Sequence, residues 1–310
     1  MGPRKVNPKL VPETLAQGRI REIYDDIKRL FGVPHVNVIF QAYAASPKFL
    51  DVLWRTLRPA VETAEFFACA DRLRASAVTI MHNYYPVPDL CARIKEMQFS
   101  EGAQNELTNL VQLFCYGDSL MLLFVATASR AMDSPVGTGQ PGQPAERRAP
   151  VQERPVVLDD AQSPPATLRI FEDIRSTLGF AFVNSDYRAL ARWPDFLQQY
   201  WTALKPIVQS PLYPKHMADM RDAALSFAAE LPGTYDLTVS RLEEAGLESE
   251  EAAEMARISD VFLDNLSGMA LNIAVAKLSL EDGTTSINSR KQPQPSSNQP
   301  EPSSAAEHVA

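Results

Sequence analysis

The chain has 310 residues, 45% of them apolar, and a formal net charge of −8 at neutral pH. Lysine and arginine never run longer than a pair, so no basic patch suits a nucleic-acid backbone and we expect no nucleic-acid partner. The longest strongly apolar stretch, Leu120 to Ala128, is about half a bilayer span, so no membrane association is expected. Three widely spaced cysteines favour free thiols in a reducing compartment, the cytoplasm.

An internal repeat organises the chain. A shift of 147 positions aligns residues 23–59 with residues 170–206 without a gap, and 14 of these 37 positions are identical. A shift of 148 then aligns the apolar positions of residues 107–123 with those of residues 255–271. We therefore predict two tandem homologous repeats, residues 20–131 and 167–280, that form a pseudo-dimer.

The remaining segments in chain order are an N-terminal arm (1–19), a proline-rich linker (132–166) and a tail (281–310). The linker holds seven of the 24 prolines, and the tail is rich in Ser, Pro, Gln and Asn. Neither segment is expected to bury enough apolar area to offset its ordering entropy, and the tail is predicted to be disordered. Residues Gly137 to Gly142 of the linker have the G-x-G-x-x-G spacing of a dinucleotide-binding motif. No strand is predicted before them, so no dinucleotide site is expected there.

The periodicity inside each repeat is helical. Apolar residues recur at i, i+3, i+4 and i+7, as in Leu107, Leu110, Val111 and Phe114, and no segment alternates long enough to be a strand. The predicted fold class is all-α. Pro47 and Pro194 are expected near helix starts, whereas Pro59 and Pro206 are expected to end or kink the helices that carry them.

The two repeats differ sharply at one place. Residues 36–40 read Val-Asn-Val-Ile-Phe, whereas residues 183–187 read Val-Asn-Ser-Asp-Tyr. Asn, Ser and Asp are good N-cap residues, so a helix start is one interpretation. However, the first repeat makes the same turn with Val38 and Ile39, and burying a carboxylate costs several kcal/mol unless it is paired. Such a cost points to function, and Asp186 becomes the candidate general base.

Residues 182–206, including Asn184, Ser185, Asp186 and Tyr187, resemble the signature region of the group I 2-haloacid dehalogenases. The resemblance extends over residues 20–280 and implies a pseudo-dimer with the active site between the repeats, assembled as a homodimer. An aspartate at the position of Asp186 takes a proton from water, which attacks the halogen-bearing C2 directly and inverts it. The resemblance implies no covalent ester, no metal and no organic cofactor.

The resemblance also suggests substrate-binding residues. Ser185 could orient the water or bind the substrate carboxylate. Asn184 is similar to the residue of D-selective members, although Asn37 at the same place of the first repeat leaves a structural role open. The remaining predicted pocket residues are His35, Val38, Leu113, Tyr116 and Phe262. The chain departs from the family at Leu113, where a polar amide is expected.

Three further residues are expected to have structural roles. Arg188 is predicted to be an exposed helix charge. Trp54 and Trp201, which match across the repeats, are predicted to lie in the core.

The leading prediction is therefore hydrolysis of a small 2-haloalkanoic acid, a carbon–halide hydrolase reaction. One alternative is an enzyme similar to alkylhydroperoxidase D or carboxymuconolactone decarboxylase, but its peroxidase chemistry needs a Cys-x-x-Cys pair that Cys69, Cys91 and Cys115 do not form. The other alternative is a non-catalytic helical binding module. Whether Asp186 borders an enclosed cavity between the repeats separates the enzyme from the module.

Overall fold

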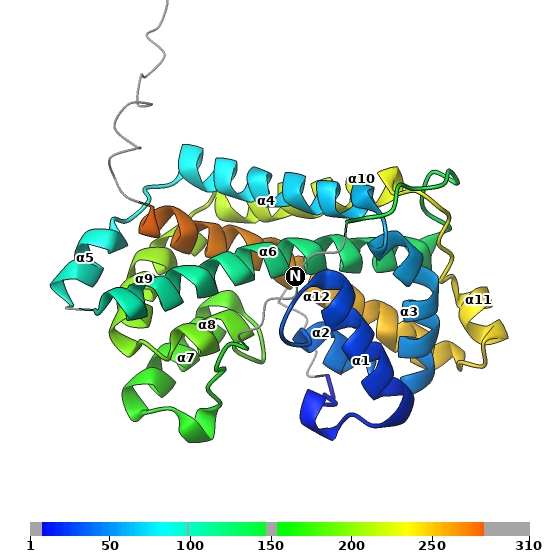
Figure 1. Ribbon diagram of the computed structural model, residues 1–310, viewed down its shortest axis with the longest axis horizontal. Helices are drawn as coiled ribbons and strands as arrows, with labels where there is room; N and C mark the ends of the chain where they lie inside the picture. The colour runs from blue at the N-terminus through cyan, green and yellow to red at the C-terminus, as the bar shows by residue number, and fades with distance from the viewer. Residues whose placement is uncertain (1–7, 98, 147–153, 282–310) are drawn as a thin grey trace, which may run out of the picture.

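The computed structural model describes residues 8–97, 99–146 and 154–281, and every regular element within them is a helix (Figure 1). The all-α prediction is confirmed. The first half of the chain contains η1 (Glu13–Leu15), α1 (Gly18–Phe31), α2 (Val38–Tyr43), α3 (Pro47–Val61), α4 (Ala64–Tyr84), α5 (Leu90–Glu96) and α6 (Glu101–Asp133). The second half contains η2 (Asp160–Gln162), α7 (Pro165–Leu178), α8 (Ser185–Leu190), α9 (Pro194–Val208), α10 (Tyr213–Glu230), α11 (Val239–Glu244) and α12 (Ser249–Leu280).

The helices of the two halves correspond in order and length. The helices α1, α2 and α3 have 14, 6 and 15 residues, and α7, α8 and α9 have the same lengths. Each half ends in one long helix, α6 with 33 residues and α12 with 32. Short helices therefore precede a long buried one in both halves.

The long helices α6 and α12 pass through the centre of the molecule (Figure 1). The helices α4 and α10 lie along one side of them, and the groups α1–α3 and α7–α9 lie on the other side at opposite ends (Figure 1). The packing crosses between the halves, because α2 packs on α12 while α8 packs on α6. This crossing brings the start of α8 against the middle of the first half's long helix.

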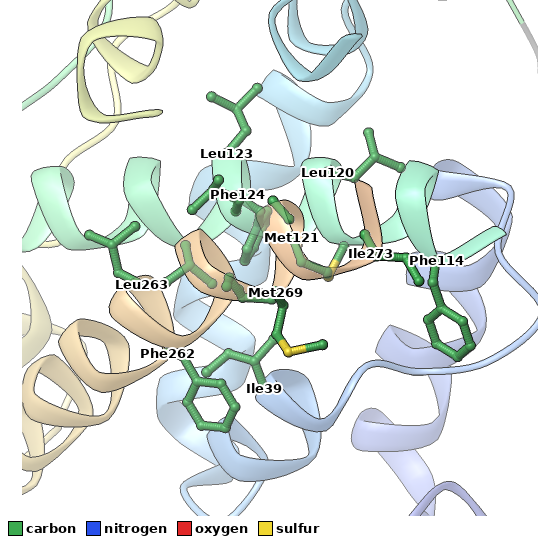
Figure 2. Close-up of a cluster of buried hydrophobic side chains, with 14 of the residues drawn as sticks. Ile39, Phe114, Leu120, Met121, Leu123, Phe124, Phe262, Leu263, Met269 and Ile273 are labelled. Atoms are coloured by element: carbon green, nitrogen blue, oxygen red, sulfur yellow. The ribbon is translucent and has the colours of Figure 1, made fainter. Parts of the chain in front are cut away.

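Apolar side chains from α6, α12 and α2 fill the space between the long helices (Figure 2). Met121, Phe124, Met269, Ile273 and Ile39 are all at most 3% exposed. By length and composition alone α6 and α12 could each cross a membrane, but 72% and 83% of their apolar windows are buried inside the protein. This burial is what core helices show.

Prolines punctuate the helices as predicted. Pro47 and Pro194 are the first residues of α3 and α9, where a missing N–H costs little. The same helices end two residues after Pro59 and Pro206.

Each half also ties its first helix to its third through a tryptophan. Trp54 and Trp201 are both 2% exposed, which confirms that they lie in the core. The indole of Trp54 donates to Asp26 at 3.0 Å, and that of Trp201 donates to Asp173 at 2.8 Å.

Part of the predicted linker is ordered, which the sequence analysis did not expect. Val136 is buried, and its backbone exchanges two hydrogen bonds with Tyr235, at 2.9 and 2.8 Å. Gly137 has φ +113°, and a Cβ there would lie 2.4 Å from the carbonyl oxygen of Gly233. Backbone pairing, together with the burial of Val136, holds residues 134–146 in place. The predicted tail beyond Glu281 and residues 1–7 of the arm lie outside the described residues.

Candidate active site

The turn before α8 differs from the turn before α2 in how its asparagine bonds. Asn37 caps α2, because its side-chain oxygen accepts a hydrogen bond from the Ile39 amide at 3.0 Å. Asn184 occupies the N-cap position of α8 but makes no capping bond. Its amide instead donates to the side chain of Asn265 on α12 at 2.8 Å. Capping therefore explains Asn37 and does not explain the side chain of Asn184.

Asp186 lies on the first turn of α8 and is 3% exposed. Its Oδ1 accepts a hydrogen bond of 3.4 Å from the Ser185 hydroxyl, whereas its Oδ2 has no partner. Burial raises the pKa of Asp186 to about 6, against hydrogen bonds from Asp118 and Ser185 that lower it. A carboxylate with a pKa near neutrality and a bare oxygen can accept a proton from water.

A second carboxyl group, missed by the sequence analysis, contacts the first. Asp118 lies in the middle of α6, is 3% exposed, and hydrogen-bonds with Asp186. Two adjacent buried carboxyls cannot both ionise, so they share a proton. Burial, followed by the charge of Asp186, raises the pKa of Asp118 well above its usual range. Asp118 therefore holds the proton, and Asp186 is the ionised member of the pair.

A signal for Asp118 was present in the sequence. The shift of 148 positions aligns it with Leu266, so a polar residue replaces an apolar one there, just as Asp186 replaces Ile39. The chain lacks the expected amide at Leu113, and Asp118 supplies a polar group a little further along the same helix.

Unsatisfied polar atoms concentrate at this place. Among the described residues, the buried side-chain atoms without a partner are His35 Nδ1, Asp118 Oδ2, Asp186 Oδ2 and Thr167 Oγ1. Folded proteins pair nearly all such atoms, so a cluster of exceptions needs an explanation. Two of the four belong to the pair of Asp118 and Asp186, and a third belongs to His35, which lines a small cavity together with Asp118.

An open cleft of about 730 Å³, large enough for a small ligand, is lined by Ser185, the residue before Asp186. The cleft is not enclosed, and Asp186 itself does not line it. It is bordered by the N-terminal segment, the loop before α2, residues 154–162 and the turn before α8. Four of the predicted site residues line it: His35, Val38, Asn184 and Ser185.

A much smaller cavity, of about 20 Å³, lies on the side of Asp118. Its walls include His35, Leu113, Phe114 and Asp118. Its volume suits a water molecule. His35 borders both the cleft and this cavity, and Asp186 is bonded to one residue of each, Ser185 and Asp118.

The ring of His35 is held in an apolar setting. It packs edge-on against Phe114 with 5.9 Å between ring centroids. Burial lowers the pKa of His35 to about 4, so the imidazole is neutral at neutral pH.

Two predicted pocket residues, Tyr116 and Phe262, line neither the cleft nor the small cavity. The Tyr116 hydroxyl donates to the carbonyl oxygen of Phe31 at 2.8 Å, and the residue borders a separate surface hollow. Phe262 is 1% exposed and stacks on Phe182, a residue of the cleft wall, at 5.7 Å. The substrate-binding roles of Tyr116 and Phe262 stay predictions.

The prediction that Arg188 is exposed is wrong. Its side chain is 19% exposed and pairs with Asp160 at 2.9 Å. Its guanidinium also donates to the carbonyl oxygens of Val183 and Leu158, at 3.1 and 3.0 Å. The arginine is held inward because it ties the turn before α8 to residues 158–160.

The described residues offer neither a metal cluster nor a cysteine pair for redox chemistry. In the described part of the chain, no three His, Cys, Asp or Glu residues are grouped to hold a metal ion. The cysteines Cys69, Cys91 and Cys115 form no disulfide with one another.

Comparison with known proteins identifies the family of the chain. Residues 34–187 match the model of the halocarboxylic acid dehydrogenase DehI family. An (R)-2-haloacid dehalogenase of Pseudomonas putida is 30% identical over 269 residues, which cover 85% of this chain and 89% of that protein. The chain belongs to the 2-haloacid dehalogenase family. The predicted enzyme class, a hydrolase of carbon–halide bonds, is confirmed by this membership.

More distant family members include a configuration-inverting 2-haloacid dehalogenase of Alcaligenes xylosoxydans xylosoxydans. It is 27% identical over 253 residues, which cover 76% of this chain and 82% of that protein. A solved structure of a D-2-haloacid dehalogenase mutant in complex with D-2-CPA has a TM-score of 0.85 and 30% identity, covering 90% of this chain and 98% of that one. The sequence match and the structural match therefore point to the same family.

Proposed function

We propose that the protein hydrolyses short D-2-haloalkanoic acids to 2-hydroxy acids of the opposite configuration, with Asp186 as the general base. The observation that carries this proposal is the buried Asp186 carboxylate, which has one bare oxygen and lies one residue from the wall of a ligand-sized cleft. The family relatives support the substrate and the stereochemistry, since they are named for (R)- or D-2-haloacids and for inversion.

The reaction needs one proton acceptor and one attack trajectory. A water molecule bound at Asp186 Oδ2 gives its proton to the carboxylate while its oxygen bonds to C2 of the substrate. The carbon–halogen bond breaks on the opposite face, the halide leaves with the bonding electrons, and C2 inverts. No ester forms on the protein. General base catalysis of this type contributes about 10²–10⁴-fold.

The cleft wall provides contacts that suit a haloacid. The Ser185 hydroxyl can donate to the substrate carboxylate or orient the water. Val38 and Phe182 offer apolar surface for the alkyl group and the halogen, and the neutral His35 ring adds to it. Asn184, fixed by Asn265, borders the space beside C2 and is the residue we assign to selection of the D enantiomer.

We also propose that the chain arose by duplication. Its segments are then an N-terminal arm (1–19), repeat 1 (20–131), the linker (132–166), repeat 2 with the catalytic aspartate (167–280) and the tail (281–310). The matching order and lengths of α1–α6 and α7–α12 support this division into a pseudo-dimer.

A cytoplasmic homodimer completes the proposal. The free thiols support a reducing compartment. Light scattering on the purified protein tests the assembly, and a mass of one chain would contradict the dimer.

Chloride release from D- and L-2-chloropropionate tests the activity. The wild type is expected to release chloride from the D enantiomer, and Asp186→Asn is expected to be slower by about 10²–10⁴-fold. Asp195→Asn, an exposed aspartate of the same half, serves as the matched control and should keep the wild-type rate. An unimpaired Asp186→Asn variant would exclude Asp186 as the base.

Labelling tests the direct attack of water. A single turnover in heavy-oxygen water should label the hydroxy acid and leave Asp186 unlabelled. Label in Asp186 would show that an aspartyl ester forms and is hydrolysed.

A further inference from the structure

Each turnover of the proposed reaction leaves a proton on a buried carboxylate. Asp186 is 3% exposed and does not itself line the cleft, so a route through the groups bonded to it would return this proton to solvent before the base acts again. The following inference rests on the proposed function. We propose that Asp118, the small cavity beside it and His35 form the route by which the proton taken up by Asp186 leaves for the open cleft.

The first step of the route is the carboxyl pair. At rest, the hydrogen-bonded pair of Asp118 and Asp186 holds one proton, because two buried carboxylates in contact cannot both be charged. After attack on the substrate the pair holds two. Loss of one proton through Asp118 restores the resting pair, with Asp186 ionised again. The Oδ2 atom of Asp118 has no protein partner, so it is free to release that proton.

The second step is the small cavity. Asp118 and His35 both line it, and each has one buried polar atom without a protein partner. A cavity of about 20 Å³ with polar groups in its wall has the room and the partners that a buried water needs. A water there connects the carboxyl of Asp118 to the imidazole.

The third step is His35, which borders the cavity on one side and the cleft on the other. A neutral imidazole has one nitrogen that accepts a proton and one that donates, so it can pass a proton across its ring. The charges that act on it are those of Glu13 and Arg154, which both lie in the cleft wall. Burial disfavours the charged ring, so His35 hands the proton on rather than keeping it.

The counterpart positions of the two repeats lack every member of this route. The shift of 147 aligns His35 with Phe182 and Asp186 with Ile39, and the shift of 148 aligns Asp118 with Leu266. The three polar residues therefore occur together in one inter-repeat site, and apolar residues occupy all three counterpart positions. A purely structural need for these polar groups would be expected on both sides.

The variant Asp118→Asn separates proton transfer from positioning. Asparagine has the shape of a protonated aspartate and can still donate to Asp186, but it cannot release a proton. We expect a first turnover close to the wild-type rate, followed by steady-state chloride release that is slower by about tenfold or more. Rapid mixing then shows a burst of one chloride per site. Asp118→Leu, which removes the hydrogen bond as well, should slow the first turnover too.

His35→Ala tests the other end of the route independently of how Asp118 variants fold. We expect its steady-state rate to fall and to recover when imidazole is added, because imidazole can enter the cleft. Imidazole should not rescue Asp118→Asn, in which the break lies deeper.

Two results would overturn the proposal: an Asp118→Asn variant without a burst, or a His35→Ala variant whose rate does not respond to imidazole. Failure of the proposed function itself looks different, since the wild type would then release no chloride from either enantiomer.

Discussion

The turns that open α2 and α8 have almost the same backbone and very different chemistry. Both N-cap asparagines have φ of −60°, with ψ of 148° at Asn37 and 153° at Asn184. Beyond them the first half continues with apolar side chains, whereas the second continues with Ser185 and Asp186. The difference teaches that the architecture needs the turn but not the polar residues. The unpaired oxygen of Asp186 is a cost that the turn before α2, with Ile39 at the same position, does not carry.

The largest effect is expected from a double variant that makes the two halves alike at the carboxyl pair. In Asp118→Leu/Asp186→Ile, each aspartate takes the residue of its counterpart. Halide release should fall by about 10²–10⁴-fold because the base is gone. The free energy of unfolding should rise by about 1–4 kcal/mol, since two buried carboxyls are replaced by apolar groups. Chloride assays and urea unfolding measure both effects.

A loss of both activity and stability in this double variant would contradict the view that the carboxyl pair is retained for chemistry. Ile39→Asp supplies the reverse control. It buries a carboxylate where the first half has no partner for it, and should destabilise the protein.

The pair of Asp118 and Asp186 predicts opposite effects of pH on activity and on stability. Below pH about 6 the activity should fall about tenfold per pH unit, because Asp186 becomes protonated. Stability runs the other way. The pKa values of Asp118 and Asp186 are higher in the folded protein than in the unfolded chain, so the folded state keeps protons that the unfolded chain loses.

The stabilisation by the Asp186 proton is present below pH about 4 and is lost as the pH rises through about 6, whereas that by the Asp118 proton is lost only at higher pH, because the pKa of Asp118 is raised further. Comparing urea unfolding of the wild type with that of the double variant across this range measures it. A constant difference in the free energy of unfolding would show that the two carboxyls are not shifted.

The tryptophan ties should behave alike in both halves. Trp54→Phe and Trp201→Phe each remove one indole hydrogen bond to an aspartate of the first helix of that half. Each should lower the free energy of unfolding by about 1–3 kcal/mol, with similar values for the two. Thermal or urea unfolding provides the measurement. A large difference between the two variants would show that the two hydrogen bonds do not stabilise the halves equally.

The smallest effects are expected at the two asparagines. Asn37→Ala should cost about 1 kcal/mol through the lost cap and leave the ratio of D to L rates unchanged. Asn184→Ala should relax that ratio, because the amide fixed by Asn265 no longer borders the cleft. Rates on the two enantiomers of 2-chloropropionate decide the matter. An unchanged ratio in Asn184→Ala would assign Asn184 to structure alone.

Much of the fold could be predicted from the sequence. The helical period identified the class, and comparing the two sequence repeats singled out Asp186, because its polar side chain interrupts a position that is apolar in the first repeat. Its role as the base stays a prediction. Asp118 was not predicted, because it lies within a strongly apolar helix, where the helical periodicity indicates only a position in the core. Its role depends on α8 packing against α6, a contact between the halves that no local pattern contains.

The order of residues 134–146 was unpredictable for a related reason. Composition measures how much apolar surface a segment can bury, but this segment is held by backbone bonds to partners distant in sequence. Arg188 was misjudged in the same way, since the groups that hold it inward, Asp160 and Leu158, lie in another segment.

The bridge between Val136 and Tyr235 joins backbone positions about a hundred residues apart. The packing of α2 on α12 and of α8 on α6 is also distant in sequence. Helical proteins usually fold fast because their contacts are local, and distant contacts slow folding. This chain is thus built from fast-forming elements that can lock together only after nearly the whole polypeptide exists. The first half should therefore leave the ribosome before the helices that it packs against exist, and the pair of Asp118 and Asp186 should form among the last contacts.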